Sequence, residues 1–303
     1  MNFSTFVQAV LTASTYAIDP AAIYNGGYNS TNNIVLRIGN GGAGQSGLIE
    51  ALANAFIKAS VKNGTDPFEI AWYKSDTTQS INYLQDGTVD IGITYTPAAE
   101  QLAIKTGIAK SPAWYAWRDH FLLVGPASNP ANLSKNQDIQ TQFSTLYTTA
   151  EAGNTDPPVR FLTRYDKSAT NIKESQLWIE IGQVPWATAY STWYHQYITY
   201  PIQALTAAIL LDEYTITDRG TYLSISTQLQ NQTTIYKAGT DDAADPLLNP
   251  AHILIGEGAK NERMADRFAQ WAISDEGQKV ITGFKKNGEQ LYTAAPENKT
   301  AQF

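Results

Sequence analysis

The 303-residue sequence contains no cysteine, which excludes disulfides, thiolate metal ligands and a cysteine nucleophile. It therefore also lacks the acylated cysteine that anchors many bacterial surface proteins. Histidine occurs only as His120, His195 and His252, and the wide spacing contains no H-x-H or H-E-x-x-H pattern typical of a metal site. No G-x-S-x-G or G-x-x-x-x-G-K-[ST] motif occurs either. We therefore expect no resident metal, no cofactor and no catalysis.

Charged residues are also scarce, at 16%, and the net charge is −7. No Lys/Arg run with interleaved aromatics occurs, so nucleic acid is not an expected partner. No stretch approaches the roughly 20 apolar residues that span a bilayer, so we expect no membrane insertion. Hydrophobic residues make up 43% of the chain, which is enough for a packed core. At this length, two lobes are favoured over one compact domain.

The N-glycosylation pattern Asn-x-Ser/Thr is over-represented, where chance predicts about three occurrences. It begins at Asn2, Asn29, Asn63, Asn132, Asn231 and Asn298. This excess favours a secreted, glycosylated protein of a eukaryotic, fungal type, or a periplasmic one if the source is bacterial. The mildly apolar opening, Phe3 to Ala17, lacks a basic start and is either a retained signal peptide or an arm. Residues 1–32 are predicted to precede the main fold.

A glycine-rich loop follows the first clear strand pattern of the chain. The β-branched run Ile34 to Ile38 is followed by GNGGAGQSG at Gly39 to Gly47, and apolar residues at helical spacing begin at Leu48. Further strands are predicted at Phe68 to Tyr73 and Val89 to Thr94, with a helix between them. Strands that alternate with helices indicate parallel βαβ units, so the expected fold class is α/β.

Two apolar runs, Phe121 to Gly125 and Ile253 to Ile255, are candidates for strands that cross between the lobes. The expected boundaries are 33–122 plus 249–303 for the first lobe and 123–248 for the second. Two helices are expected near the end of the chain, one over Asn261 to Ile273 and one with Ser274 as its N-cap.

The pattern R-x-D-x-S-x-T, formed by Arg164, Asp166, Ser168 and Thr170, is the strongest indication of a binding site. It supplies a fork-shaped cation, hydroxyl donors, and a carboxylate that can orient the arginine or accept a proton from an anion. On the residues alone, a helix cap at Ser168 beside a surface pair of Arg164 and Asp166 is the more common explanation.

The glycine-rich loop is the second candidate for a site that binds an anion. Asn40, Gly41, Gly42 and Ser46 place backbone N–H groups ahead of a helix dipole, which suits an anion stripped of water. The alternative is a tight strand-to-helix turn without a ligand, and the residues alone do not separate the two.

From Ile34 to the C-terminus, the order of motifs resembles the tungstate-binding protein family. The matching segments are Gln45 to Phe56 (QSGLIEALANAF), Val89 to Glu100, Phe121 to Pro126, Arg164 to Trp178, Thr215 to Leu223 (TITDRGTYL), Asp245 to Pro250 (DPLLNP) and Trp271 to Tyr292. The resemblance implies a type II periplasmic-binding-protein fold, with two lobes joined by two crossing strands. It implies a tungstate- or molybdate-like oxyanion held in the cleft and passed to a membrane permease. Thr77 falls where the family has a G-T-G loop and is a further candidate contact.

The sequence departs from the family at several positions that face the expected ligand. The family's hydroxyl-rich T-T-T-S is replaced by Gly39 to Gly42, which removes side-chain donors and offers backbone amides instead. Bulky residues at Thr199 to Ile202 stand against a flexible Q-G-M-G, Ala169 replaces glycine, and Asn171 replaces histidine.

Two other hypotheses follow from these departures. One is a secreted scaffold that keeps the fold but acts in adhesion, assembly or host contact, with self-assembly as a candidate partner interaction. The other is an enzyme on this fold, such as those that rework pyrimidine precursors of thiamine, which the lack of cysteine and of clustered histidine disfavours.

Overall fold

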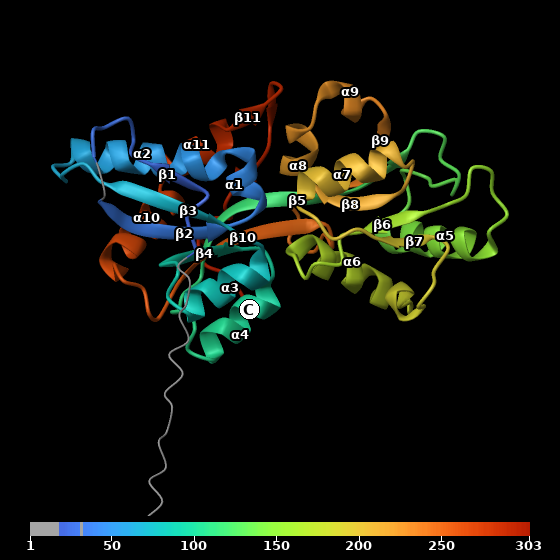
Figure 1. Cartoon of the computed structure of the whole chain (residues 1–303), viewed down its shortest axis with the longest axis horizontal. Helices are drawn as coiled ribbons and strands as arrows, with labels where there is room; N and C mark the ends of the chain where they lie inside the picture. Colours follow the sequence, from blue (N-terminus) through green and yellow to red (C-terminus); the bar gives the residue numbers. More distant parts are fainter. Residues whose placement is uncertain (1–17, 31–32) are drawn as a thin grey trace, which may run out of the picture.

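The computed structural model describes residues 18–30 and 33–303, so the predicted signal or arm over residues 1–17 lies outside the described residues. Two lobes lie side by side along the long axis of the molecule, and β5 (Trp114–Pro126) and β10 (Leu248–Ile255) run from one to the other (Figure 1). None of the described helices has the length and apolar character that crossing a membrane requires.

One nine-stranded mixed sheet extends through both lobes. Its strands are β1 (Ala22–Tyr24), β2 (Ile34–Asn40), β3 (Glu69–Lys74), β4 (Ile91–Thr94), β5, β8 (Thr215–Asp218), β9 (Thr233–Ala238), β10 and β13 (Thr293–Ala294). Their order is β1-β3-β2-β4-β10-β5-β13, and β8 and β9 pair with the far part of β5. Two small sheets pair β6 (Phe161–Thr163) with β7 (Tyr194–Gln196) and β11 (Lys285–Lys286) with β12 (Glu289–Gln290).

The predicted parallel βαβ arrangement is present in the first lobe. Strand β2 pairs in parallel with both β3 and β4, and a helix connects β2 to β3. Strands β1 and β10 run antiparallel to their neighbours, so the sheet is mixed. The α/β fold class is therefore confirmed. Residues 22–24, which were expected to belong to an arm, form the edge strand β1.

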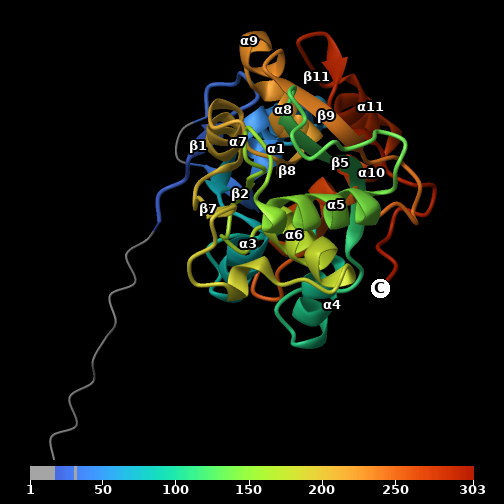
Figure 2. The same ribbon diagram turned by 90° about the vertical axis from the view of Figure 1, so that its right-hand side faces the viewer.

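Helices cover the sheet in both lobes. Those of the first lobe are α1 (Gly42–Ser46), α2 (Leu48–Lys62), α3 (Thr77–Gln85), α4 (Pro97–Lys105), α10 (Glu262–Ile273) and α11 (Asp275–Gly283). The remaining helices are α5 (Ile139–Ala152), α6 (Ala169–Glu180), α7 (Pro201–Leu210), α8 (Arg219–Ser224) and α9 (Thr227–Gln230), with a 3-10 turn at Pro185–Ala187. Figure 2 views the molecule from the end that carries α5 and α6.

Alternation along the strands divides the core of each lobe into two layers, because successive side chains point to opposite faces of a sheet. In β3, Ile70 and Trp72 pack with α2, α10 and α11, whereas Ala71 and Tyr73 pack with α3 and α4. The far half of β5 behaves in the same way in the second lobe. Its odd-numbered residues Phe121 and Leu123 pack with α5 and α6, and the even-numbered ones pack with α7.

The predicted glycine loop is wrong over Gly42–Ser46, which form the short helix α1. The Asn40 side chain accepts a hydrogen bond from the Gly44 N–H at 2.8 Å, and Gly44 lies against the Trp72 ring. Gly47 then adopts a φ of 96°, a left-handed conformation that glycine tolerates, and joins α1 to α2. The predicted cap at Ser274 is present and begins α11, and Asn261, where the other helix was expected to start, is the N-cap of α10.

Gly44→Ala is expected to destabilise the protein because its added Cβ would lie 2.2 Å from Cε2 of Trp72. Overpacking of this kind typically costs about 1–3 kcal/mol. The matched control is Gly283→Ala at the end of α11, where an added Cβ meets no heavy atom within 4 Å. Urea denaturation should show a lower midpoint for the first variant only. Equal midpoints for Gly44→Ala and the wild type would contradict this packing of α1 on Trp72.

Candidate functional site

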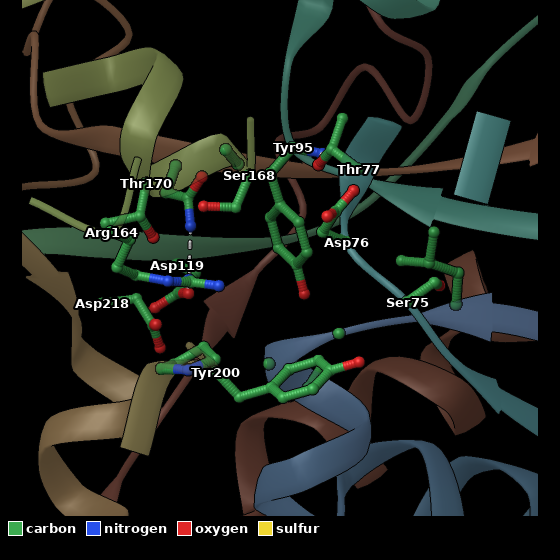
Figure 3. Close-up of a pocket in the computed structure, with 17 residues that line it drawn as sticks. Ser75, Asp76, Thr77, Tyr95, Asp119, Arg164, Ser168, Thr170, Tyr200 and Asp218 are labelled. Atoms are coloured by element: carbon green, nitrogen blue, oxygen red, sulfur yellow. Dashed lines mark hydrogen bonds between the residues drawn. The ribbon is translucent and has the colours of Figure 1, made fainter. Parts of the chain in front are cut away.

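A cavity of about 50 Å³ lies between the two lobes, at the level where β5 and β10 cross (Figure 3). Turns that connect a strand to a helix reach it from both sides, namely β2 to α1, β3 to α3, β6 to α6 and β8 to α8, together with the start of α7. Ligands of open α/β sheets bind at such carboxyl ends of strands. Because pockets for larger organic ligands measure roughly 300–1,000 Å³, this cavity suits a small ion.

Six of the nine predicted site residues line this one cavity. They are Gly41, Gly42, Thr77, Arg164, Ser168 and Thr170. The structure therefore brings together the backbone after the first long strand and the guanidinium of Arg164, which are more than 120 residues apart in the sequence. Contact of these residues with a ligand stays a prediction.

Three predicted residues, Asn40, Ser46 and Asp166, lie behind the cavity lining. Asn40 is fully buried, and its side-chain amide donates to the Ile93 carbonyl at 2.9 Å. The Ser46 hydroxyl donates to the Ala43 carbonyl at 3.0 Å and lies 2.9 Å from the Tyr292 hydroxyl. Both side chains are occupied in holding α1, so they position the backbone of the site and do not face its interior.

Asp166 fixes the loop that carries Arg164. Its Oδ2 lies 2.5 Å from a terminal nitrogen of Arg164, and its Oδ1 accepts from the Ser168 N–H at 3.0 Å. The Arg164 Nε donates to the Thr199 carbonyl at 3.2 Å. The side chains of Arg164 and Asp166 are only 8% and 13% exposed, so the expectation of a surface pair is wrong. The guanidinium thus offers oriented N–H groups whose positive charge is largely compensated.

The same loop contains two unfavourable backbone conformations. Tyr165 and Lys167 have φ values of 47° and 63°, in the left-handed region that costs about 1–2 kcal/mol for a residue with a side chain. The Tyr165 N–H donates to the Thr163 hydroxyl at 3.3 Å, and the Lys167 N–H donates to the Asn171 side chain at 3.1 Å. These bonds, with those of Asp166, hold the loop in a shape that aims Arg164 at the cavity.

Ser168 caps a helix and also lines the cavity, and its contact with a ligand stays a prediction. It is the N-cap of α6, and its Oγ accepts from the Asn171 N–H at 3.3 Å. Because the oxygen acts as the acceptor there, the hydroxyl proton stays available to a group in the cavity. Asp76 caps α3 in the same way, accepting from the Gln79 N–H at 2.7 Å. First-turn N–H groups of a helix have no partner within the helix, so both helices direct donors at this region.

Three carboxyl groups that the sequence did not single out also line the cavity: Asp76, Asp119 and Asp218. Burial raises the pKa of Asp119 well above its usual range, and the nearby charge of Asp218 raises it further. Burial is also the main cause that raises the pKa of Asp76. The available signal was weak, since Asp119 merely precedes the apolar run Phe121 to Gly125 and Asp218 is a helix N-cap.

Two contacts between the lobes lie on the solvent side of the cavity. The Lys74 ammonium sits 3.5 Å from the centroid of the Tyr200 ring, and the Thr78 hydroxyl donates to the Lys167 carbonyl at 2.9 Å. Tyr200 belongs to the bulky segment that departs from the family pattern, and Figure 3 shows its ring at the edge of the site. The lobes are therefore in contact around the cavity, which is small as a result.

Among residues 18–30 and 33–303, no group of three or more His, Asp or Glu side chains is arranged to hold a metal ion. The carboxyl groups at the cavity have other partners. Asp76 and Asp218 cap helices, and Asp119 accepts from the Asn249 side chain at 3.1 Å. Donors from backbone, hydroxyl and guanidinium groups therefore form the more complete set of ligand-facing groups.

Two lobes joined by crossing strands, with a small cavity between strand-to-helix turns of both, are the architecture of the periplasmic-type binding proteins. The chain belongs to the PBP superfamily, because the model of the PBP superfamily domain matches residues 13–276. A solved structure, described as a candidate periplasmic metal-binding protein, has a TM-score of 0.85 and 65% identity. That match covers 91% of this chain and 100% of the other.

The expected resemblance to tungstate-binding proteins is confirmed. The tungstate-binding protein TupA of Peptoclostridium acidaminophilum is 28% identical over 258 residues, which cover 82% of this chain and 81% of that protein. A candidate anion-binding protein of an ABC transporter from Haloferax volcanii is 27% identical over 265 residues, covering 85% of this chain and 71% of the relative.

Glu174 supports the site from behind, and its burial links the stability of the fold to pH. Its carboxyl group accepts from the Thr163 hydroxyl at 2.5 Å, the Tyr194 hydroxyl at 2.7 Å and the Trp178 Nε1 at 3.0 Å. These bonds tie α6 to the strands β6 and β7. Burial raises the pKa of Glu174 from 4.5 to about 7.

Glu174→Gln is expected to remove a loss of folding stability that wild-type Glu174 causes as the pH rises. Between pH 4.5 and about 7, the unfolded chain releases a proton that folded Glu174 retains, so stability falls as pH rises. Relative to the wild type, the variant should therefore gain up to about 3 kcal/mol between pH 5 and 8. Urea denaturation at both pH values measures this difference. Glu180→Gln, at an exposed residue of the same helix, should lose as much stability between the two pH values as the wild type. If Glu174→Gln also lost as much as the wild type, Glu174 would not be the cause of the pH dependence.

Proposed function

We propose that this protein binds a small oxyanion of the tungstate or molybdate type in the cavity between its lobes and does not transform it. The observation that carries the proposal is the convergence of Gly41, Gly42 and Arg164, from opposite lobes, on one small cavity. The printed roles of the relatives, tungstate binding and anion binding, support the same ligand class.

The donor groups suit an anion that has lost its hydration shell. Backbone N–H groups at helix starts, the hydroxyl groups of Ser168 and Thr170, and the guanidinium of Arg164 surround the space from several sides. Such donors stabilise negative charge without adding much net positive charge, since Asp166 compensates Arg164. The glycines at positions 41 and 42 allow close approach to the backbone where the resembled family carries hydroxyl side chains.

The space admits little beyond an inorganic ion. A single water needs roughly 10–15 Å³ of a cavity, so about 50 Å³ holds a tetrahedral oxyanion but not a sugar or a nucleotide. Tyr200 and Pro201 line the side on which the resembled family has small, flexible residues. These bulkier groups limit the ligand further.

The proposed place of action is outside the cytoplasm, in the periplasm or the extracellular space. A membrane permease is the proposed recipient of the ligand if the source is bacterial, in line with the ABC transporter named for the archaeal relative. Glycosylation at the Asn-x-Ser/Thr sites and self-association stay predictions.

Thermal denaturation with tungstate, molybdate, sulfate and phosphate tests the proposal. A specific ligand at 100 times its Kd stabilises the folded state by about 2.7 kcal/mol, which raises the melting temperature measurably. Arg164→Ala should abolish the rise, because it removes the fork-shaped donor. Arg160→Ala changes an exposed arginine of the same lobe and should keep the rise.

Circular dichroism of both arginine variants establishes that each is folded. If no oxyanion raises the melting temperature of the wild type, the binding proposal fails and the scaffold hypothesis gains support. If Arg164→Ala responds like the wild type, the cavity is not the binding site.

A further inference from the structure

Asp119 is placed at the cavity in an unusual way for a carboxyl group. It lies on the crossing strand β5, is only 3% exposed and lines the space proposed for the oxyanion. Its Oδ1 accepts from the His120 N–H at 2.8 Å, and its Oδ2 accepts from Asn249 at 3.1 Å. No arginine, lysine or histidine of the described ranges forms an ion pair with it. Its polar contacts are therefore two uncharged donors, the His120 N–H and the Asn249 side-chain amide.

The charges around the cavity present a conflict for an anionic ligand. Asp76, Asp119 and Asp218 line it together with a single cation, Arg164, so full ionisation would leave the lining with a charge of −2. Arg164 is in addition paired with Asp166. Like charges in a buried space repel strongly, because water does not screen them there. A dianion binds this cavity only if at least one of the carboxyl groups is neutral.

The surroundings single out Asp119 as the neutral group. The charge of Asp218 of β8 acts on it, and half-buried Tyr95 and buried Tyr292 lie beside it. Arg219 of α8 is the nearby cation, but its Nε is bonded to the Gln290 carbonyl. His120 directs its ring to Asp241, away from the cavity. Burial and the charge of Asp218 both raise the pKa of Asp119, which favours its protonated form.

Asp76 and Asp218 have different partners from those of Asp119. Asp218 accepts from the Thr221 N–H at 2.7 Å and from the Thr221 hydroxyl at 2.6 Å. Asp76 accepts from the Gln79 N–H at the start of α3; burial raises its pKa, and this hydrogen bond and the charge of Arg164 oppose the rise. Hydrogen bonds at helix starts stabilise a carboxylate. Asp76 and Asp218 accept hydrogen bonds at helix starts, whereas Asp119 does not, and this difference makes Asp119 the candidate for the neutral carboxyl group.

We propose that Asp119 contacts the oxyanion as a neutral carboxylic acid that donates its O–H to a ligand oxygen. This inference rests on the proposed function and names the ligand class more closely. Fully deprotonated oxyanions, such as sulfate, molybdate and tungstate, offer only acceptors and satisfy this donor. Phosphate carries at least one proton at neutral pH, and a ligand O–H that faces the Asp119 O–H leaves one donor unpaired. Sites of this kind reject such ligands strongly because unpaired buried polar groups are costly.

Titration calorimetry of the full chain with sulfate, molybdate, tungstate and phosphate at pH 7 and pH 9 tests the inference. The wild type should bind at least one deprotonated oxyanion at least tenfold more tightly than phosphate. Its affinity should be lower at pH 9 as Asp119 loses its proton. Asp119→Asn keeps the carbonyl acceptor of the neutral acid and replaces its O–H donor with an N–H donor that does not titrate. It should therefore retain affinity for the deprotonated anions within about threefold and lose the pH dependence.

Asp119→Leu removes the donor and should weaken binding of the deprotonated anions at least tenfold, provided that its melting temperature shows a folded protein. The control Asp266→Asn, an exposed residue of α10, should match the wild type throughout. Preference of the wild type for phosphate, with loss of that preference in Asp119→Asn, would overturn the proposal and make Asp119 an ionised acceptor. Binding that both Asp119 variants leave unchanged would overturn it as well.

The experiment distinguishes failure of the proposed function from failure of the role proposed for Asp119. Absence of binding for every oxyanion defeats the proposed function, and with it this inference. Oxyanion binding by the wild type without discrimination against phosphate defeats only the role of Asp119.

Discussion

The change of hydrogen-bonding partners along β5 is the constraint on which the site depends. Up to His120 this strand pairs with β10, and from Phe121 onward it pairs with β8 and β9. Asp119 faces Asn249 across the ladder, and two residues further along, Phe121 faces Asp218. Asp119, Asn249 and Asp218, which form the floor of the cavity, therefore come from β5 and from its two partner strands, β10 and β8, close to the change of partner. Because backbone hydrogen bonds fix this register, the floor has little freedom to rearrange.

The walls of the cavity follow from the same arrangement. Each lobe buries its own apolar layers, and the turns that connect strands to helices meet where the two halves of the sheet part. Those turns carry helix starts, so the interface is rich in N–H donors, while the floor carries carboxyl groups. A ligand bound there as proposed would have to satisfy both sets, so the number of its protons would matter as much as its size.

Much of the fold could be predicted because apolar periodicity and caps act locally. Strands near residues 34, 69 and 91, and helices capped by Asn261 and Ser274, required only neighbouring residues for their assignment. Helix α1 was missed because it has only five residues, two of them glycines, which gives little helical signal, and its stability comes from Asn40 and Trp72. The lobe boundaries and the ligand contacts stay predictions.

The site was predictable where residues lie close in the sequence, as in the segment from Arg164 to Thr170. It was not predictable for Asp119, whose importance arises from β-pairing with residues more than 90 positions away. The burial of the Arg164–Asp166 pair was likewise hidden, because only the packed second lobe removes it from solvent.

The contacts of Lys74 with Tyr200 and of Thr78 with Lys167 join the rims of the two lobes. For an ion bound as proposed, separation of these rims would widen its path into and out of the cavity. Its measured affinity would then be the intrinsic affinity reduced by the fraction of molecules that are competent to bind. Contacts between the lobes would thereby influence how long the ion stays.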